Sequence, residues 1–214
     1  MGSVAADRDS SEEPINVLIT GFEPFKKDYP VNPSWEIARS LPTHLPPVRV
    51  KTTPSSEEPP IPPVRLLVHP TPIRVAYPTV RALVPSLWHL DEDDAPDTPE
   101  RERRPRIDAV IHIGMAGPRL FYSIERRGHR DGHLDLRISE DAGHYLCDFI
   151  YFSSLAHLYK AGVERKVLFL HVPSDASEHS VAIGRELVLQ LVRAVVESEM
   201  VRRRKAEGET TKSE

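Results

Sequence analysis

The chain has 214 residues, with 28 Lys and Arg against 32 Asp and Glu, and a formal net charge of −4. This length predicts one domain, and the negative balance argues against a nucleic-acid partner held by phosphate contacts. The only cysteine excludes an internal disulfide and is typical of a reducing compartment.

The first residues carry no targeting signal. Residues 1–14 are polar and acidic and lack the apolar centre of a signal peptide. No apolar run approaches the roughly 18 residues that a membrane span needs. We therefore expect a disordered tail over 1–14 and a cytosolic protein that does not enter a membrane.

The first folded element is predicted at residues 15–20, a short apolar and β-branched run that Gly21 ends. The turn at 21–25 places Phe22 and Phe25 on either side of a proline, where open α/β sheets hold ligands. The alternative is that both rings cap the core. A helix is expected to start near Asn32 or Ser34, either of which can cap it.

Prolines and charges interrupt the next part of the chain. Residues 51–63 and 91–106 are predicted loops, the first rich in proline and the second in charge. The first loop separates an apolar stretch at 48–50 from a strand at 64–68. A helix is predicted over 79–90, with Pro85 expected to kink or break it.

Strands and helices alternate in the second half as well. Strands are predicted at 107–114, 120–125, 134–139 and 166–173, and helices after Cys147 and from Ser177 to about Val201, with a polar tail over 202–214. The alternation predicts a single three-layer α/β/α domain over 15–201, around a largely parallel, mixed sheet.

Cys147 stands where a loop becomes a helix. A thiol at a helix N-terminus feels the positive end of the backbone dipoles, which favours the thiolate. The free N–H groups there can also hold a developing oxyanion. The alternative is a buried structural cysteine.

Two further residues have the chemistry that a thiol nucleophile needs. His171 lies at the carboxyl end of a strong strand and can serve as a base near neutral pH. The alternative is a structural histidine at a strand end whose ring nitrogens are already hydrogen-bonded. Glu125 follows a predicted strand and can orient that histidine, unless it is a surface carboxylate paired with Arg126 or Arg127.

Metal and nucleotide chemistry find little support. His129 and His133 are four residues apart, but Asp131 and Gly132 between them indicate a loop. The chain has no HExxH, Walker or GxGxxG motif. We expect no metal and no cofactor.

Six motifs in one order together resemble pyroglutamyl-peptidase I, also called pyrrolidone-carboxylate peptidase. The motifs are LITGFEPF at 18–25, VNPSWE at 31–36, HIGM at 112–115, IER at 124–126, DAGHYLCD at 141–148 and FLHVP at 169–173. The resemblance covers residues 15–26, 31–42, 74–90 and 107–200.

The resemblance implies a cytosolic cysteine peptidase that removes N-terminal pyroglutamate from peptides, without a cofactor and often as a homo-oligomer. It implies a triad in which Cys147 is the nucleophile, His171 the base and Glu125 the orienting acid. The implied substrate-binding residues are Phe22 and Phe25 around the lactam ring, Asn32 ordering the pocket, and Tyr145 and Leu146 before the nucleophile.

One departure from the family affects the functional prediction. Relatives have several tens of residues between the glutamate and the cysteine motif, whereas here only residues 126–140 intervene. A parallel crossover needs about a dozen residues or more, so we expect that a segment is missing, with part of the pocket wall.

Three hypotheses remain open from the sequence. The first is a pyroglutamyl peptidase, active or weakened by the deletion. The second is a catalytically inactive relative that binds peptides or is a truncated isoform. The third, which rests on composition alone, is a scaffold that binds partners through the proline-rich loop at 51–63.

Overall fold

The structure is a computed structural model that describes residues 14–47, 61–88, 105–117, 119–125, 136–139, 145–164 and 166–210. The predicted tail over 1–14 except its last residue, the stretch at 48–50 and most of both predicted loops lie outside these residues. The segment expected to be shortened is described only over β5 (Leu136–Ser139).

The described strands form one sheet of six, in the order β2-β1-β3-β6-β4-β5. Besides β5, the strands are β1 (Ile15–Thr20), β2 (Val64–Val68), β3 (Ala109–Met115), β4 (Tyr122–Glu125) and β6 (Val167–Val172). All neighbours pair in parallel except β4, which runs antiparallel to β6. The predicted largely parallel, mixed sheet is confirmed.

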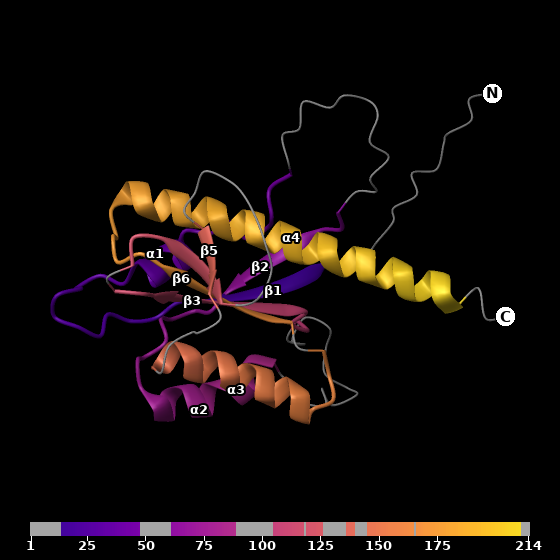
Figure 1. Ribbon diagram of the computed structural model, residues 1–214, viewed down its shortest axis with the longest axis horizontal. Helices are drawn as coiled ribbons and strands as arrows, with labels where there is room; N and C mark the ends of the chain where they lie inside the picture. The colour runs from indigo at the N-terminus through magenta and orange to yellow at the C-terminus, as the bar shows by residue number, and fades with distance from the viewer. Residues whose placement is uncertain are drawn as a thin grey trace, which may run out of the picture.

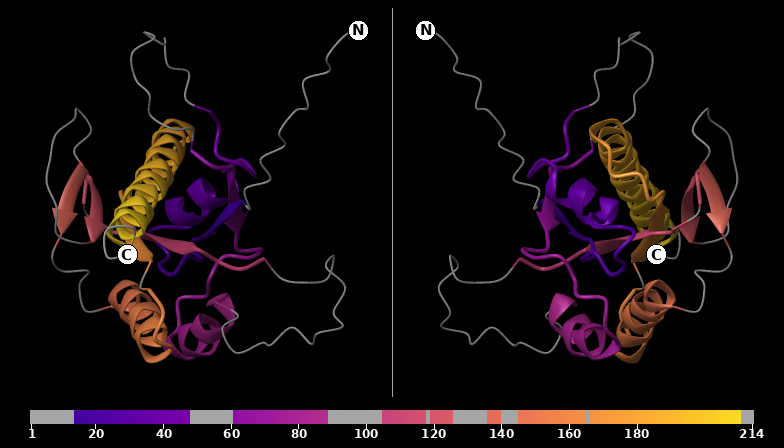
Figure 2. Two further views of the ribbon diagram at one scale, coloured as in Figure 1. Left: turned by 90° about the vertical axis from the view of Figure 1, so that its right-hand side faces the viewer. Right: turned by 90° about the vertical axis from the view of Figure 1, so that its left-hand side faces the viewer.

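Helices cover both faces of the sheet (Figures 1 and 2). They are α1 (Pro33–Arg39), α2 (Tyr77–Trp88), α3 (Leu146–Lys160) and α4 (Glu178–Thr210). Helices α1 and α4 lie over one face, and α2 and α3 lie over the other. The predicted three-layer α/β/α architecture is therefore confirmed.

Alternation along the strands divides the core into two layers. Val17 and Ile19 of β1 pack in a cluster with α1 and α4, while Leu18 between them packs in a cluster with α2 and α3. Successive strand residues point to opposite faces, so a strand buried on both sides reads as a continuous apolar run. This explains why β1, β3 and β6 were the clearest strands in the sequence.

The turn after β1 is tied to the start of α1. Asn32 caps the helix, because its Oδ1 accepts hydrogen bonds from the backbone N–H (3.1 Å) and the hydroxyl (2.8 Å) of Ser34. A Cβ atom at Gly21 would lie 2.7 Å from the Ser34 carbonyl oxygen, so only glycine allows the turn to approach the helix this closely.

Two helix predictions need correction. Of the kink or break expected at Pro85, the break does not occur, because α2 continues to Trp88. Its buried residues Val80, Val84 and Leu87 pack beneath the sheet, and this packing outweighs the lost backbone bond. Helix α4 ends at Thr210 rather than near Val201. Arg202, on its charged extension, pairs with Glu199 one turn earlier and with Glu164.

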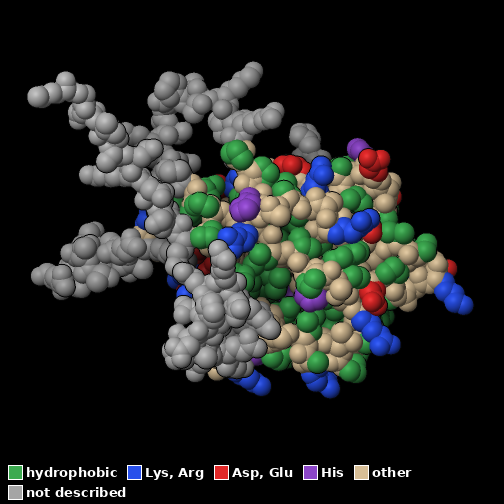
Figure 3. All heavy atoms as spheres, turned by 180° about the vertical axis from the view of Figure 1, so that it is seen from behind, with side chains coloured by type: hydrophobic (Ala, Val, Ile, Leu, Met, Phe, Trp, Pro, Cys, Tyr) green, Lys and Arg blue, Asp and Glu red, His purple; other side chains and the backbone are tan. Residues whose placement is uncertain are grey.

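The described part of the surface is of mixed character. Seen from behind, charged side chains are scattered among hydrophobic ones (Figure 3). None of the helices in the described ranges has the length and apolarity that a membrane span requires.

Candidate active site

A buried hydrogen bond joins His171 of β6 to Glu125 of β4. The distance from His171 Nδ1 to Glu125 Oε1 is 2.6 Å, and the two side chains are 5% and 2% exposed. Because a carboxylate accepts this bond, Nδ1 carries the proton in the neutral ring, and Nε2 is left with its lone pair. This is the tautomer that a general base requires.

The strand register brings these two residues to one face of the sheet. Ser123 is the antiparallel partner of His171, and Glu125 lies two residues further along β4 on the same face. The Ser123 hydroxyl donates to Glu125 Oε1 at 3.2 Å. Arg119 Nη1 donates to Ser123 Oγ at 3.1 Å and to Glu125 Oε1 at 3.3 Å.

These contacts keep Glu125 ionised. Burial alone raises the pKa of Glu125, but hydrogen bonds from His171, Ser139 and Ser123 lower the pKa below its usual value. A carboxylate that is buried and yet charged orients its histidine firmly, and Oε1 of Glu125 accepts hydrogen bonds from His171, Ser123 and Arg119.

Cys147 lies in the first turn of α3, as the sequence predicted. The helix begins at Leu146, and Tyr145 occupies the cap position without a capping side-chain bond. The cysteine is partly buried and free. Its backbone N–H belongs to the first turn, where helices leave donors unused.

The sulfur of Cys147 faces the sheet beside His171. A Cβ atom at Gly114 would lie 3.0 Å from Sγ, and Gly114 is the register partner of His171 on the neighbouring strand. Adjacent strands are about 4.8 Å apart, and parallel partners project to the same face. The thiol, the imidazole and the carboxylate therefore occupy one face of the sheet near the ends of β3, β4 and β6.

The helix start favours the thiolate of Cys147, as expected, but other effects outweigh it. Burial raises the pKa of the Cys147 thiol to about 12, and the charge of Glu125 acts in the same direction. The backbone N–H of Cys147 and the charge of Arg119 lower the pKa, but by less. Burial cannot be read from the sequence, and here it outweighs the helix dipole.

The two aromatic residues of the first turn have different environments. Phe22 is 3% exposed and packs with Leu146 and Phe169 in the core. Phe25 is 46% exposed, and its ring lies 5.6 Å from Lys26 Nζ. Phe22 thus matches the alternative of a ring that caps the core, while Phe25 is available to a ligand.

The other predicted pocket residues are also split. Asn32 is buried and donates from Nδ2 to the Glu23 carbonyl oxygen at 3.0 Å, so it holds the turn that carries both phenylalanines. Leu146, the first residue of α3, is buried, whereas Tyr145 is 81% exposed. Asn32 and Leu146 therefore shape the site from below, and only Tyr145 is open to solvent.

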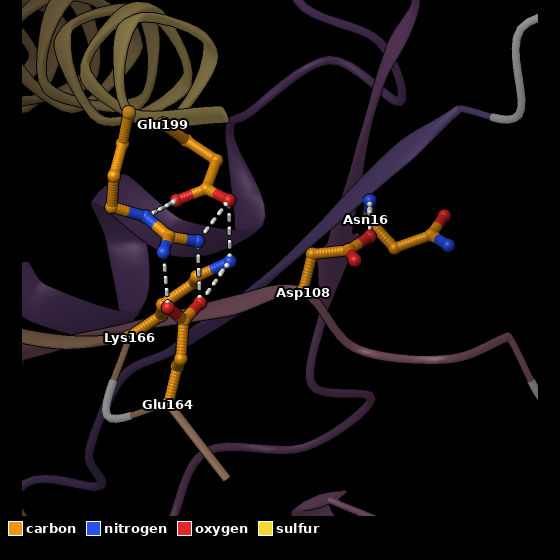
Figure 4. Close-up of polar contacts among 6 residues, drawn as sticks. Asn16, Asp108, Glu164, Lys166 and Glu199 are labelled. Atoms are coloured by element: carbon orange, nitrogen blue, oxygen red, sulfur yellow. Dashed lines mark hydrogen bonds and ion pairs between the residues drawn. The ribbon is translucent and has the colours of Figure 1, made fainter. Parts of the chain in front are cut away.

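A cavity of about 1340 Å³ lies at the other end of the sheet. It is lined by the first residues of β3 and β6 and by α3 and α4, and it reaches none of the three candidate catalytic residues. At its rim, Lys166 Nζ contacts Glu164 (3.0 Å) and Glu199 (2.8 Å) (Figure 4). Arg202 bridges the same two carboxylates. These charges neutralise one another and offer a ligand no unpaired partner among themselves.

Metal ligands are not grouped in the part of the chain that the structure describes, where no three His, Cys, Asp or Glu side chains could hold an ion. His129 and His133 lie outside the described residues.

Sequence reasoning missed three residues that build the site: Arg119, Ser123 and Gly114. Ser123 had a signal, because it shares the face of its strand with Glu125 by alternation. Gly114 belongs to the HIGM motif at 112–115, but nothing along the chain indicated that Phe169 and Cys147 would fill the space above it. Arg119 had no signal beyond its charge.

The architecture belongs to the three-layer α/β/α domains in which polar side chains gather at one edge of a mixed sheet. No protein-family model and no curated protein sequence matches the chain.

Solved structures of pyrrolidone carboxyl peptidases share this fold. The protein from Pyrococcus furiosus aligns over 88% of this chain and 99% of its own, with 20% identity and a TM-score of 0.53. A mutant of the Pyrococcus protein aligns over 86% and 97%, with 20% identity and a TM-score of 0.52. The protein from Thermococcus litoralis aligns over 74% and 76%, with 20% identity and a TM-score of 0.50. At 20% identity, these similarities show that the chain has the same fold, and they show nothing about its activity.

Proposed function

We propose that the chain is a cysteine peptidase that removes N-terminal pyroglutamate from peptides, with Cys147 as nucleophile, His171 as base and Glu125 as orienting acid. The observation that carries the proposal is the buried His171–Glu125 hydrogen bond of 2.6 Å beside the only cysteine of the chain. The fold shared with pyrrolidone carboxyl peptidases supports the choice of substrate.

The chemistry begins from a neutral thiol. With a thiol pKa of about 12, Cys147 does not ionise by itself at neutral pH. The S–H proton passes to His171 Nε2 as the sulfur attacks the carbonyl carbon that joins the pyroglutamyl ring to the next residue. Glu125 stabilises the imidazolium that forms.

The intermediate then collapses with the proton held by His171. The oxyanion lies against N–H groups of the first turn of α3, which have no partner within the helix. The imidazolium protonates the departing amine, and a thioester joins the pyroglutamyl group to Cys147. Water, deprotonated by His171, hydrolyses the thioester and restores the thiol.

A pyroglutamyl residue suits the residues around the site. It has no charged amine, so its pocket needs apolar surface and a few hydrogen bonds rather than a counter-charge. The half-exposed ring of Phe25 supplies such surface, and the turn that carries it is fixed by Asn32.

The test is release of fluorophore from a pyroglutamyl-coumarin amide. Wild-type protein should cleave it, and Cys147→Ser should not. Prolyl- and glutamyl-coumarin amides serve as controls, since the first lacks the lactam carbonyl and the second has an open, charged chain. Equal turnover by wild type and Cys147→Ser would refute the proposal.

A second candidate is a catalytically inactive relative that binds pyroglutamyl peptides without cleaving them. Two observations favour it: the high pKa of the thiol and the burial of Phe22, which leaves little of that ring for a ligand. Calorimetry with a pyroglutamyl peptide decides between the two. Binding without turnover supports this candidate, and turnover excludes it.

Self-association follows from the family resemblance alone. We propose a homo-oligomer, and light scattering on the purified chain tests it: the mass of a monomer would contradict the proposal.

A further inference from the structure

We propose that Arg119 is a positioning residue of this site, which fixes Glu125 and balances its negative charge so that Cys147 can become a thiolate. The inference rests on the proposed function and adds a fourth residue to the three already assigned. It starts from the geometry of the guanidinium group.

Two hydrogen bonds and one ring contact hold the guanidinium of Arg119 beside Glu125. Nη1 donates to Ser123 Oγ at 3.1 Å and to Glu125 Oε1 at 3.3 Å, and the group lies 6.0 Å from the centre of the Phe121 ring. An ion pair with these distances would contribute little to stability if both partners were exposed to solvent. Here Glu125 is only 2% exposed, although Arg119 is 33% exposed, so the pair is screened from solvent on the acid's side.

The charges at the site show why such a residue is needed. When the proton moves from Cys147 to His171, the triad holds two negative charges and one positive charge. The excess negative charge opposes ionisation of the sulfur, since Glu125 raises the pKa of Cys147. Arg119 brings the sum to zero, and its charge lowers the same pKa.

The other charged groups near the sulfur do not supply this balance. Asp148, the next residue of α3, also raises the pKa of Cys147. His171 on β6 gains its positive charge only by taking the proton itself. Of the described residues that act on the thiol electrostatically, Arg119 is therefore the one permanent cation.

The single cysteine makes the inference directly measurable, because alkylation by iodoacetamide reports Cys147 alone. We expect Arg119→Gln to slow alkylation about three- to tenfold at every pH between 7 and 10. The higher figure, about tenfold, is the loss of thiolate that follows when the pKa of Cys147 rises by about one unit. The lower figure, about threefold, applies because a thiolate of higher pKa is also a better nucleophile. Arg119→Lys keeps the charge and should stay within about twofold of wild type.

Arg202→Gln is the matched control. Arg202 also joins two carboxylates, but at the rim of the distant cavity, so its loss should leave the alkylation rate unchanged. A purely structural role for Arg119 predicts the opposite sign in Arg119→Gln, because loosening the site exposes the thiol and speeds alkylation. Unchanged or faster alkylation would therefore overturn the inference.

If circular dichroism shows that Arg119→Gln does not fold, Arg119→Lys decides. A loss of about tenfold despite the retained charge overturns the inference, and a rate within about twofold of wild type supports it.

Turnover of the pyroglutamyl-coumarin amide separates this inference from the proposed function. If wild type cleaves the amide and Arg119→Gln is alkylated normally, the inference fails and the function stands. If wild type does not cleave it but Arg119→Gln is alkylated more slowly, the function fails and the charge balance stands.

Discussion

His112 gives the protein a measurable sensitivity to acid. The side chain is fully buried in β3 between β1 and α3, with Nδ1 2.8 Å from Thr20 Oγ1 and Nε2 3.0 Å from Ser154 Oγ. Burial lowers the pKa of His112 from 6.5 to about 3. The folded protein therefore keeps this ring neutral at a pH where the unfolded chain protonates it.

The size of the effect follows from these two pKa values. The unfolded state binds the extra proton between pH 6.5 and about 3, so the contribution of His112 to stability is present above pH 6.5 and is lost as the pH falls. One pKa unit corresponds to about 1.4 kcal/mol. Lowering the pH from about 7.5 to about 5 should then reduce the free energy of unfolding by about 2 kcal/mol through this residue alone.

Urea unfolding at several pH values tests this prediction by comparing wild type with His112→Gln. The variant should be less stable at every pH, because glutamine does not reproduce both hydrogen bonds of the imidazole. Between the two pH values, however, its free energy of unfolding should fall by about 2 kcal/mol less than that of wild type. His44→Gln, at an exposed position, should keep the wild-type pH dependence. If His112→Gln loses as much stability as wild type between these pH values, the reasoning is refuted.

Two further predictions concern the site itself. In Gly114→Ala, the new Cβ would lie 2.6 Å from the Phe169 ring and 3.0 Å from Cys147 Sγ. We therefore expect thermal unfolding to show a free energy of unfolding lower by about 1–3 kcal/mol, together with loss of most of the turnover. Gly117→Ala, whose Cβ would meet only Tyr29 Oη at 3.8 Å, is the control, and equal effects of the two changes would contradict the prediction. Phe25→Ala should raise KM for the pyroglutamyl amide while changing stability by less than about 0.5 kcal/mol, whereas the buried Phe22→Ala should cost about 3–5 kcal/mol; an unchanged KM in Phe25→Ala would remove that ring from the pocket.

The sequence predicted the strands well because burial on both faces leaves an unbroken apolar run. The clearest strand predictions fell on β1, β3 and β6, the centre of the sheet. Helix boundaries were less predictable, since they depend on contacts between distant parts of the chain. Arg202, for example, pairs with Glu199 one turn earlier and also with Glu164, 38 residues earlier, and the second contact could not be read from the sequence.

The candidate site was only partly accessible to sequence reasoning. Chain order and chemistry singled out Cys147, His171 and Glu125, and the register of β3, β4 and β6 brings them to one face. The ionisation of Cys147 could not be predicted, because it depends on how deeply Sγ is buried. Arg119 was missed for a similar reason: its contact with Glu125 forms across a turn that has no regular periodicity.

The candidate chemistry depends on the register of β4 more than on the core of the sheet. Only Ser123 and Ile124 pair with β6, and a slip by one residue would turn Glu125 to the opposite face, away from His171. Most of the core around β1, β3 and β6 comes from these strands and from the four helices, and β4 adds Tyr122 and the partly buried Ile124 to it. The segment that the resemblance predicts to be shortened, residues 126–140, follows β4 directly. We therefore predict that a change there which shifts the register of β4 abolishes the His171–Glu125 hydrogen bond, while the pairing of β1, β2, β3 and β6 and the packing of their helices are retained.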